Sequence, residues 1–154
     1  MKNWLYNNKE IKEIDDFGKN VFGFIYKITN KETGKFYIGK KTLSFVRNKK
    51  LGKKETAALK EERKNQSMRG AVPKKKKVIT ESDWKDYFGS SKELTDEINK
   101  IGKDKYSREI LQLSYNSKQN TYFEVLYQMK YDVLRRDDCF NNSILGKFSN
   151  RDFL

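Results

Sequence analysis

Alternating hydrophobic residues mark the clearest predicted strand of this chain, residues 22–29, with the sequence FGFIYKIT. Every second position is aromatic or branched, which places one set of side chains on a single face of a strand: Phe22, Phe24, Tyr26 and Ile28. A polar turn at 30–34 ends in Gly34, which can adopt a positive φ, and a second strand, KFYIGK, follows at 35–40. The pattern predicts a β-hairpin.

The second half of the chain has two segments with helical patterns. Ser90 or Ser91 can cap a helix that Gly102 stops, with apolar residues on one helix face. Residues 106–114, YSREILQLS, predict a third strand, and residues 118–134 predict another long helix.

The remaining segments carry weaker patterns. Residues 1–20 predict a short polar helix or arm, and residues 42–50 can begin a helix. Residues 55–69 are rich in strong helix formers, whereas residues 78–88 predict an irregular segment. Together the elements predict an α+β domain: a small three-stranded antiparallel or mixed β-sheet flanked by helices, with a basic helical insertion.

The composition restricts the chemistry that is open to this chain. The 154 residues support one domain and contain no histidine. A Ser-His-Asp triad, a Cys-His pair and an H-E-x-x-H zinc site are therefore excluded. Cys139, the single cysteine, cannot form an internal disulfide, and no histidine can activate it as a nucleophile. Catalysis near neutral pH would have to use Tyr, Lys, Arg, carboxylates or a metal.

The apolar residues predict a small packed core and no membrane partner. Aromatic residues make up 14% of the chain, which is typical of a folded protein rather than of a disordered basic tail. No apolar run approaches the roughly 20 residues that span a bilayer, and the N-terminus lacks the apolar centre of a signal peptide. We expect a soluble protein of the cytoplasm.

The positive charge is concentrated in one segment. The net charge is +13, and residues 40–77 hold 15 Lys and Arg against 3 acidic residues. A solvated loop is one interpretation, and a surface that contacts the phosphates of DNA is the other. The DNA-binding interpretation assigns this role to the basic side chains Lys40, Lys41, Lys49, Lys50, Lys53, Lys54, Arg63, Arg69, Lys74, Lys75, Lys76 and Lys77.

Two tyrosines stand in a short motif on the predicted hairpin. The first strand contains Gly23-Phe-Ile-Tyr26 and the second Tyr37-Ile-Gly39, with eleven positions between the tyrosines. Arg47 follows Tyr37 by ten positions. Further along, a carboxylate lies within an apolar run, Thr-Tyr-Phe-Glu124-Val-Leu-Tyr, and an asparagine follows an aromatic residue in Phe140-Asn141.

These residues, in this order, resemble the GIY-YIG nucleases, and in particular the phage homing-type, Seg-like endonucleases. The resemblance covers roughly residues 22–145. The chain differs from the family pattern by one extra residue in the first triplet, by the absence of histidine, and by a longer and more basic stretch after Arg47. That stretch leaves Arg63 and Arg69 as alternative sources of the catalytic arginine.

The resemblance implies a role for each matching residue. Glu124 would hold a divalent metal, Mg²⁺ or Mn²⁺. Tyr26 would act as general base or proton relay, with nearby Lys40, Lys41 or Arg47 favouring the phenolate. Tyr37 would position water or phosphate.

The remaining matches are supporting residues. Gly39 would allow a close approach of backbone or phosphate, and Arg47 would bind phosphate oxygens. Asn141 would order the site, with Asn142 as the alternative. Trp84 and Tyr87 are candidates for base stacking, but core packing is the more common role of such residues.

The resemblance also implies a domain organisation and a function. It predicts an N-terminal arm or helix at 1–21, a nuclease domain at 22–145 with a basic insertion at about 48–80, and a tail at 146–154. It predicts a metal-dependent endonuclease that acts on double-stranded DNA, as a monomer or a homodimer. The alternative is a DNA-binding protein that keeps the fold but has little or no catalytic activity.

Overall fold

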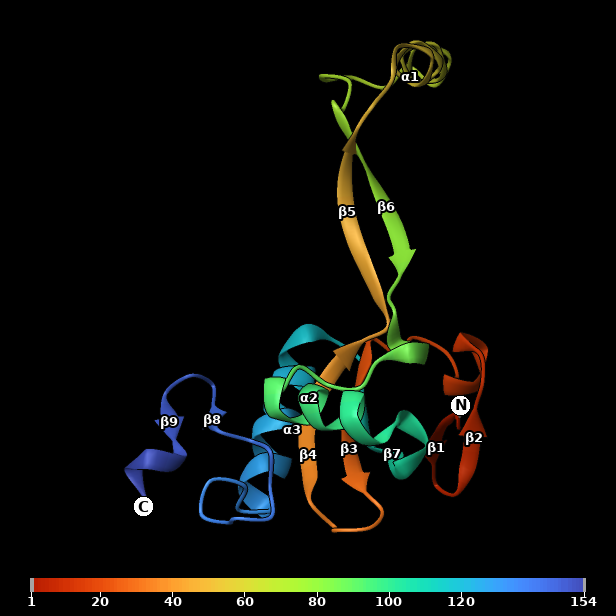
Figure 1. The fold of residues 1–154 in the computed structure, drawn as a ribbon. Coiled ribbons are helices and arrows are strands. Elements are labelled where there is room, and N and C mark those ends of the chain that lie inside the picture. Colours follow the sequence, from red (N-terminus) through yellow and green to blue (C-terminus); the bar gives the residue numbers. More distant parts are fainter. Residues whose placement is uncertain (1, 154) are drawn as a thin grey trace. The chain divides into compact units, whose positions relative to one another are not determined.

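The computed structural model describes residues 2–153, which form two compact units (Figure 1). Residues 44–81 make up the smaller one, which we call the ribbon unit. The other described residues make up the core unit. Each is described by itself.

A five-stranded mixed sheet forms the centre of the core unit, in the order β2-β1-β7-β3-β4. Its strands are β1 (Trp4–Tyr6), β2 (Lys9–Ile11), β3 (Gly23–Asn30), β4 (Phe36–Thr42) and β7 (Tyr106–Ser114). β3 runs antiparallel to both β4 and β7, whereas β1 runs parallel to β7. The α+β class, the hairpin and the third strand are confirmed, but the sheet has two strands more than predicted.

Those extra strands come from the N-terminal residues, where the prediction of a helix or arm was wrong. β1 and β2 form a hairpin whose two-residue turn is Asn7-Asn8, with φ of 50° and 62°. Asparagine tolerates the left-handed backbone that such a turn requires. Trp4 is 1% exposed and packs in the core, so this segment belongs to the folded sheet; a short 3₁₀ helix, Ile14–Phe17, follows it.

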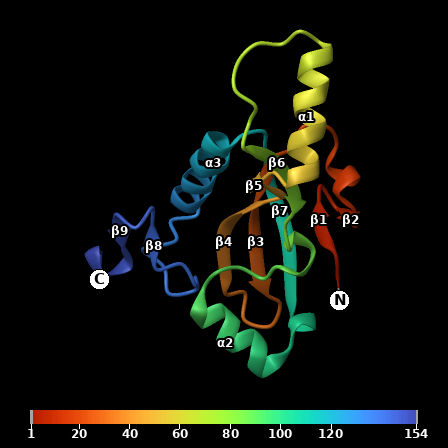
Figure 2. The same ribbon diagram turned by 90° about the horizontal axis from the view of Figure 1, so that it is seen from above.

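Helices cover the two faces of the sheet (Figure 2). Phe24, Tyr26 and Ile28 of β3 share one apolar cluster with α2 (Lys92–Ile101). Ile25 points to the opposite face, where a second cluster packs against α3 (Ser117–Lys130). The alternation seen in the sequence therefore separates two small cores.

Local signals set the ends of both helices. Ser91 caps α2 by accepting the backbone N–H of Leu94 at 3.3 Å, and Gly102 ends this helix with φ of 96°. Asn116 caps α3 by accepting the N–H of Gln119 at 2.9 Å. α3 ends at Lys130, four residues earlier than predicted.

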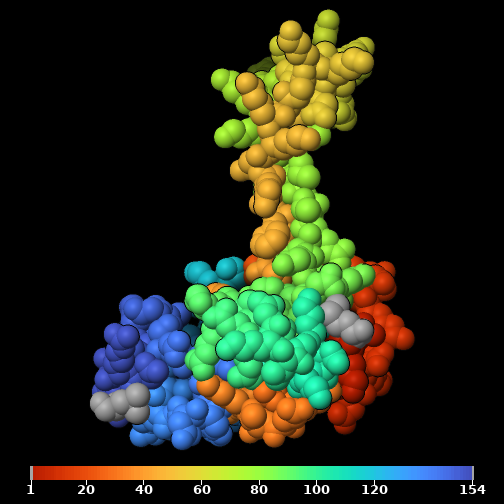
Figure 3. Space-filling model, in the orientation of Figure 1, coloured from red at the N-terminus to blue at the C-terminus, as the bar shows by residue number. Residues whose placement is uncertain are grey.

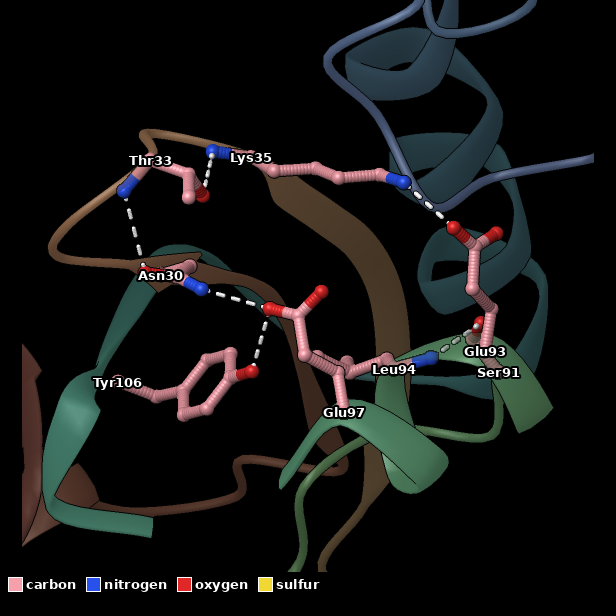
Figure 4. Close-up of polar contacts among 8 residues, drawn as sticks. All are labelled: Asn30, Thr33, Lys35, Ser91, Glu93, Leu94, Glu97 and Tyr106. Carbon is pink, nitrogen blue, oxygen red and sulfur yellow. Dashed lines mark hydrogen bonds and ion pairs between the residues drawn. The ribbon is translucent and has the colours of Figure 1, made fainter. Parts of the chain in front are cut away.

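A polar network fixes α2 to the turn of the β3–β4 hairpin (Figure 4). The Glu97 carboxylate accepts hydrogen bonds from Asn30 Nδ2 and from the Tyr106 hydroxyl, each at 2.6 Å. Burial raises the pKa of Glu97, but these two hydrogen bonds, together with the charges of Lys35 and Lys100, hold the pKa below its usual value. Lys35 Nζ adds an ion pair to Glu93 at 2.5 Å. The network fixes the N-terminal end of α2 beside Tyr37.

Short elements complete the core unit. They are the 3₁₀ helices Trp84–Asp86, Lys103–Lys105 and Asn150–Asp152, and the strands β8 (Ser143–Ile144) and β9 (Phe148–Ser149). In Figure 3 the C-terminal segment and α2 form adjoining parts of the surface of this unit.

The ribbon unit consists of two long strands and a helix. β5 (Ser44–Lys50) pairs antiparallel with β6 (Lys75–Glu81), and α1 (Lys53–Asn65) lies between them in sequence. The prediction of a helix at 42–50 was therefore wrong, and so was that of an irregular segment over 78–81. Aromatic and β-branched residues pair across these strands, as in Val46 with Ile79, and such residues favour strand pairing.

Candidate active site

The two motif tyrosines lie on the same face of the β3–β4 hairpin. Tyr26 is paired with Gly39, and Tyr37 with Ile28, so the tyrosines are diagonal neighbours rather than direct partners. Their ring centroids are 6.1 Å apart. A Cβ at position 39 would overlap the Tyr26 hydroxyl and would lie 2.7 Å from Tyr26 Cζ. Gly39 is therefore required for space, because the ring of Tyr26 lies directly over its backbone.

A third tyrosine completes the cluster. The hydroxyl of Tyr26 is hydrogen bonded to Tyr87, and the two rings pack edge to face with their centroids 5.8 Å apart. The hydroxyl of Tyr37 contacts Ser90 Oγ at 2.9 Å. The sequence indicated Tyr87 only as a stacking or packing candidate, since nothing in its neighbourhood along the chain links it to Tyr26.

Burial keeps Tyr26 protonated. Tyr26 is 1% exposed, and burial first, then the nearby tyrosines and Glu124, raise its pKa well above the usual value. Lys40 Nζ donates to Thr121 at 2.8 Å, while Lys41 Nζ donates to Asp83 at 2.5 Å. The expectation that these lysines favour the phenolate is therefore wrong for the protein without substrate.

Arg108 holds the segment that carries Tyr87. This guanidinium, 4% exposed, donates to the backbone oxygens of Tyr87 and Lys85 at 2.9 and 2.8 Å. It also lies over the rings of Trp4 and Phe88, and burial lowers its pKa to about 10. A charged residue at an inward position of a predicted strand was the sequence signal for this buried role.

Glu124 extends from α3 to the edge of β4. Its carboxylate accepts the backbone N–H of Lys40, which points outward from the edge strand β4. Burial raises the pKa of Glu124, and the charge and backbone N–H of Lys40 oppose that effect. Its charge in turn raises the pKa of both Tyr26 and Tyr37.

Asn141 closes the same edge of the sheet. Its Nδ2 donates to the carbonyl of Ile38 at 2.8 Å and its Oδ1 accepts the N–H of Ile38 at 3.0 Å. Gln128 Nε2 donates to the same carbonyl at 3.1 Å. Asn141 is buried whereas Asn142 is exposed, so Asn141 is the asparagine that orders this edge.

One face of α3 carries three polar side chains, of which the sequence motifs indicated only Glu124. Asn120, Glu124 and Gln128 are four residues apart, which places them on one face of the helix. Asn120 accepts a hydrogen bond from Ser114 at 2.7 Å, and Glu124 and Gln128 bind the edge of β4. The spacing is readable in the sequence, but its meaning depends on the sheet edge that this helix face meets.

A polar pocket of about 310 Å³ opens beside Tyr37 within the core unit. Its lining includes side chains from four separate parts of the sequence: Tyr37, Ser90, Gln128, Phe140, Asn141 and Asn142. Tyr37 and Asn141 thus join Ser90 and the helix-capping Ser91 around a space open to solvent.

The site can accept a cation through one carboxylate. Residues 2–153 contain no cluster of three or more His, Cys, Asp or Glu with metal-binding geometry. Glu124 has a carboxylate partly withdrawn from water, and an ionised carboxylate has acceptor capacity beyond its bond to Lys40 N–H. A single carboxylate fits Mg²⁺, which keeps several waters and binds substrate phosphates.

The predicted arginines belong to the ribbon unit. Arg47 is exposed on β5 opposite Val78, and Arg63 on α1 donates to the carbonyl of Arg69 at 3.0 Å. The core unit brings together the other predicted site residues: Tyr26, Tyr37, Gly39, Lys40, Lys41, Glu124 and Asn141. The lysines from Lys49 to Lys77 lie in the ribbon unit with the arginines.

Two further candidates behave as packing residues. Trp84 is fully buried and lies in the core cluster beside Phe17. Cys139 is also buried, and burial raises the pKa of its thiol to about 11, which disfavours a thiolate nucleophile.

Comparison with known families gives one match. The family described as "Putative endonuclease segE, GIY-YIG domain" matches residues 4–145, a span that includes the hairpin, the ribbon unit, α3 and Asn141. Neither a curated protein nor a solved structure matches the chain. No helix within residues 2–153 has the length and apolar character needed to span a bilayer.

Proposed function

The chain belongs to the GIY-YIG endonuclease family of segE, and we propose that it is a divalent-metal-dependent endonuclease that hydrolyses phosphodiester bonds in double-stranded DNA. The proposed type is that of the phage homing enzymes. The observation that carries the proposal is the arrangement of Tyr26 and Tyr37 over Gly39 on the β3–β4 hairpin, with the Glu124 carboxylate bound to the backbone N–H of Lys40 in the same strand β4.

Glu124 would hold Mg²⁺ or Mn²⁺. When bound, the metal supplies a Lewis acid that neutralises charge on the phosphate and lowers the pKa of a coordinated water. The hydrogen bond from Lys40 N–H fixes the carboxylate before any cation arrives. The edge of β4 thereby orients the ligand, which lessens the reorganisation needed during the reaction.

Tyr26 suits the role of proton relay rather than that of a phenolate base. Its raised pKa leaves the phenol protonated near neutral pH. A protonated phenol accepts a proton from water only as it passes its own proton on. The hydrogen bond from Tyr26 to Tyr87 would supply the path, with half-buried Tyr87 giving up its own hydroxyl proton to solvent as it receives that of Tyr26. Tyr37, held by Ser90, would orient the water or a phosphate oxygen.

Basic residues would neutralise the transition-state phosphate. Lys41 is held between Asp83 and the ring of Tyr87, 3.9 Å from the ring centroid, on the face of β4 that carries Tyr37. Arg47 is the proposed catalytic arginine, with Arg63 and Arg69 as alternatives.

A plasmid-nicking assay tests the proposal. Supercoiled plasmid should be nicked in Mg²⁺ and left intact in EDTA. Glu124→Gln should abolish nicking while DNA binding in EDTA is retained, and Tyr26→Phe should lose most activity because the relay is removed. Glu109→Gln is the matched control, since Glu109 is exposed on β7. Full nicking by Glu124→Gln in Mg²⁺ would contradict the metal role.

The alternative function is DNA binding without turnover. The strongly basic composition of the ribbon unit favours binding by itself, because lysine–phosphate contacts need no catalytic site. Binding of plasmid by the wild-type protein with no nicking in Mg²⁺ or Mn²⁺ would establish this alternative.

A further inference from the structure

The two-stranded part of the ribbon unit has two unlike faces. In an antiparallel pair, directly opposed residues share a face, and successive pairs alternate between faces. One face carries the pairs Arg47–Val78 and Lys49–Lys76. The other, which we call the open face, carries four pairs: Ser44–Glu81, Val46–Ile79, Asn48–Lys77 and Lys50–Lys75.

α1 is engaged with the first of these faces. Lys76 Nζ forms an ion pair with Glu55 of α1 at 2.6 Å, and Lys76 and Val78 are half-buried. Seven of the eight residues of the open face are exposed and Ser44 is half-buried; one of the eight, Glu81 at the end of β6, is acidic.

The open face combines charge with apolar surface in an unusual way. Val46 and Ile79 are 62% and 73% exposed and form a direct cross-strand pair. Lys50 and Lys75 are also directly opposed, and like charges at such positions destabilise a strand pair. A polyanion would relieve that repulsion, and an apolar surface would cover the Val46–Ile79 pair.

The dimensions of the ribbon match one groove of DNA. Two strands lie about 4.8 Å apart, and seven paired residues extend for about 23 Å. The major groove of B-form DNA, about 12 Å wide, admits a two-stranded ribbon. Its floor presents thymine methyl groups and the adenine edge, which apolar side chains and asparagine recognise respectively.

We propose that the open face of the ribbon enters the major groove of duplex DNA, with Asn48, Val46 and Ile79 against base edges and Lys50, Lys75 and Lys77 against phosphates. The ribbon is then a sequence-reading element separate from the residues of the core unit that would cut. This inference rests on the proposed DNA substrate but not on turnover. It makes the ribbon unit the source of target preference.

The first test measures binding in EDTA, so that no cleavage intervenes. Duplexes selected from a random 30-bp pool should converge on a preferred sequence, which Asn48→Ala should change or abolish. On the selected duplex, dimethyl sulfate should show protection of guanine N7, which lies in the major groove. Protection confined to adenine N3, in the minor groove, or convergence unaffected by Asn48→Ala would overturn the proposal.

Salt dependence provides the second test. The K50A/K75A variant loses two phosphate contacts, so its plot of log K against log salt should be shallower by a slope of about 1.8. The affinity lost by this variant relative to the wild-type protein should therefore be about 60-fold larger at 0.1 M salt than at 1 M salt. The K60A/K64A variant removes the same charge from exposed positions of α1 and is the matched control. Equal losses in both variants would show that only net charge matters and would refute the open face as the contact surface.

Two further comparisons separate this proposal from others. Duplex RNA of the same sequence should bind more weakly, because the major groove of A-form RNA is too narrow for side chains to read; equal binding would overturn the assignment. Glu124→Gln should keep the guanine N7 protection although it cannot nick. If protection is seen but the wild-type protein never nicks, the ribbon proposal stands and the nuclease proposal fails.

Discussion

Gly39→Ala should disable the site by displacing one ring. The added Cβ would overlap the hydroxyl of Tyr26 and would lie 2.7 Å from Tyr26 Cζ and 3.0 Å from Tyr37 Cε1. Carbon atoms that are not bonded pack at about 3.5–4.0 Å, so the ring of Tyr26 must move by about 1 Å. It has little room to do so, because it is 1% exposed and packs against Trp4 and Tyr87.

The magnitude follows from that displacement. Overfilling a packed core costs about 1–3 kcal/mol of unfolding free energy. A misplacement of about 1 Å at a reacting centre reduces the rate about 100-fold. We therefore expect Gly39→Ala to lower stability by about 2 kcal/mol and to lower the nicking rate, measured at saturating Mg²⁺, by about two orders of magnitude.

A control and a double variant sharpen this prediction. Gly52→Ala adds the same methyl group at a position with nothing within 4 Å, and it should leave the nicking rate within about twofold. Tyr26→Phe removes the overlapping hydroxyl, so Gly39→Ala should destabilise the Phe variant less than the wild-type protein. The reasoning is refuted if Gly39→Ala nicks within tenfold of wild type and unfolds at the same denaturant concentration.

Three further predictions concern other residues. Asn141→Ala should cost about 2 kcal/mol in denaturant unfolding, because it leaves the buried N–H of Ile38 unpaired, while Asn142→Ala should cost almost nothing. The lowered pKa of Glu97 contributes stability that is complete above its unfolded-state pKa and is lost as the pH falls through its folded-state pKa. Glu97→Gln should therefore flatten the acid side of a plot of unfolding free energy against pH. An unchanged plot would count against the Glu97 network. Arg47→Ala should slow nicking at least 100-fold if Arg47 contacts the transition-state phosphate, and a loss below tenfold would direct attention to the other arginines of the ribbon unit.

Much of the core unit was predictable because its signals are local. Strict alternation in β3 assigned Tyr26 to an inward face, and Ser91 and Gly102 marked the ends of α2. The hairpin register was harder to predict. Tyr26 is paired with Gly39, two positions beyond Tyr37, and the bulge lies between β3 and β7 beside Ile25 and Tyr26, which no local signal in the sequence indicates.

Other parts depended on contacts between distant residues. β1 and β2 have three residues each, too few to show a period, and are identified by the Asn7-Asn8 turn. The ribbon was hidden because lysine-rich segments have low strand propensity, and its strands are held by pairing across about thirty residues. Tyr87 enters the site through tertiary packing alone, and the four-residue spacing that relates Gln128 to Glu124 gains its meaning only from the strand edge that both residues meet.

The edge of β4 has a consequence for the order in which the protein is completed during synthesis. Its outward-facing groups are covered by the carboxylate of Glu124, by Gln128 and Asn141, and by backbone bonds between Phe36 and residues 138–140. All of these partners leave the ribosome about 80 to 100 residues after the strand itself. Until then β4 is an unprotected edge that can pair with another chain. The residues that close this edge include the one that would bind the metal, so a nascent chain loses its exposed strand and completes its catalytic site in the same step.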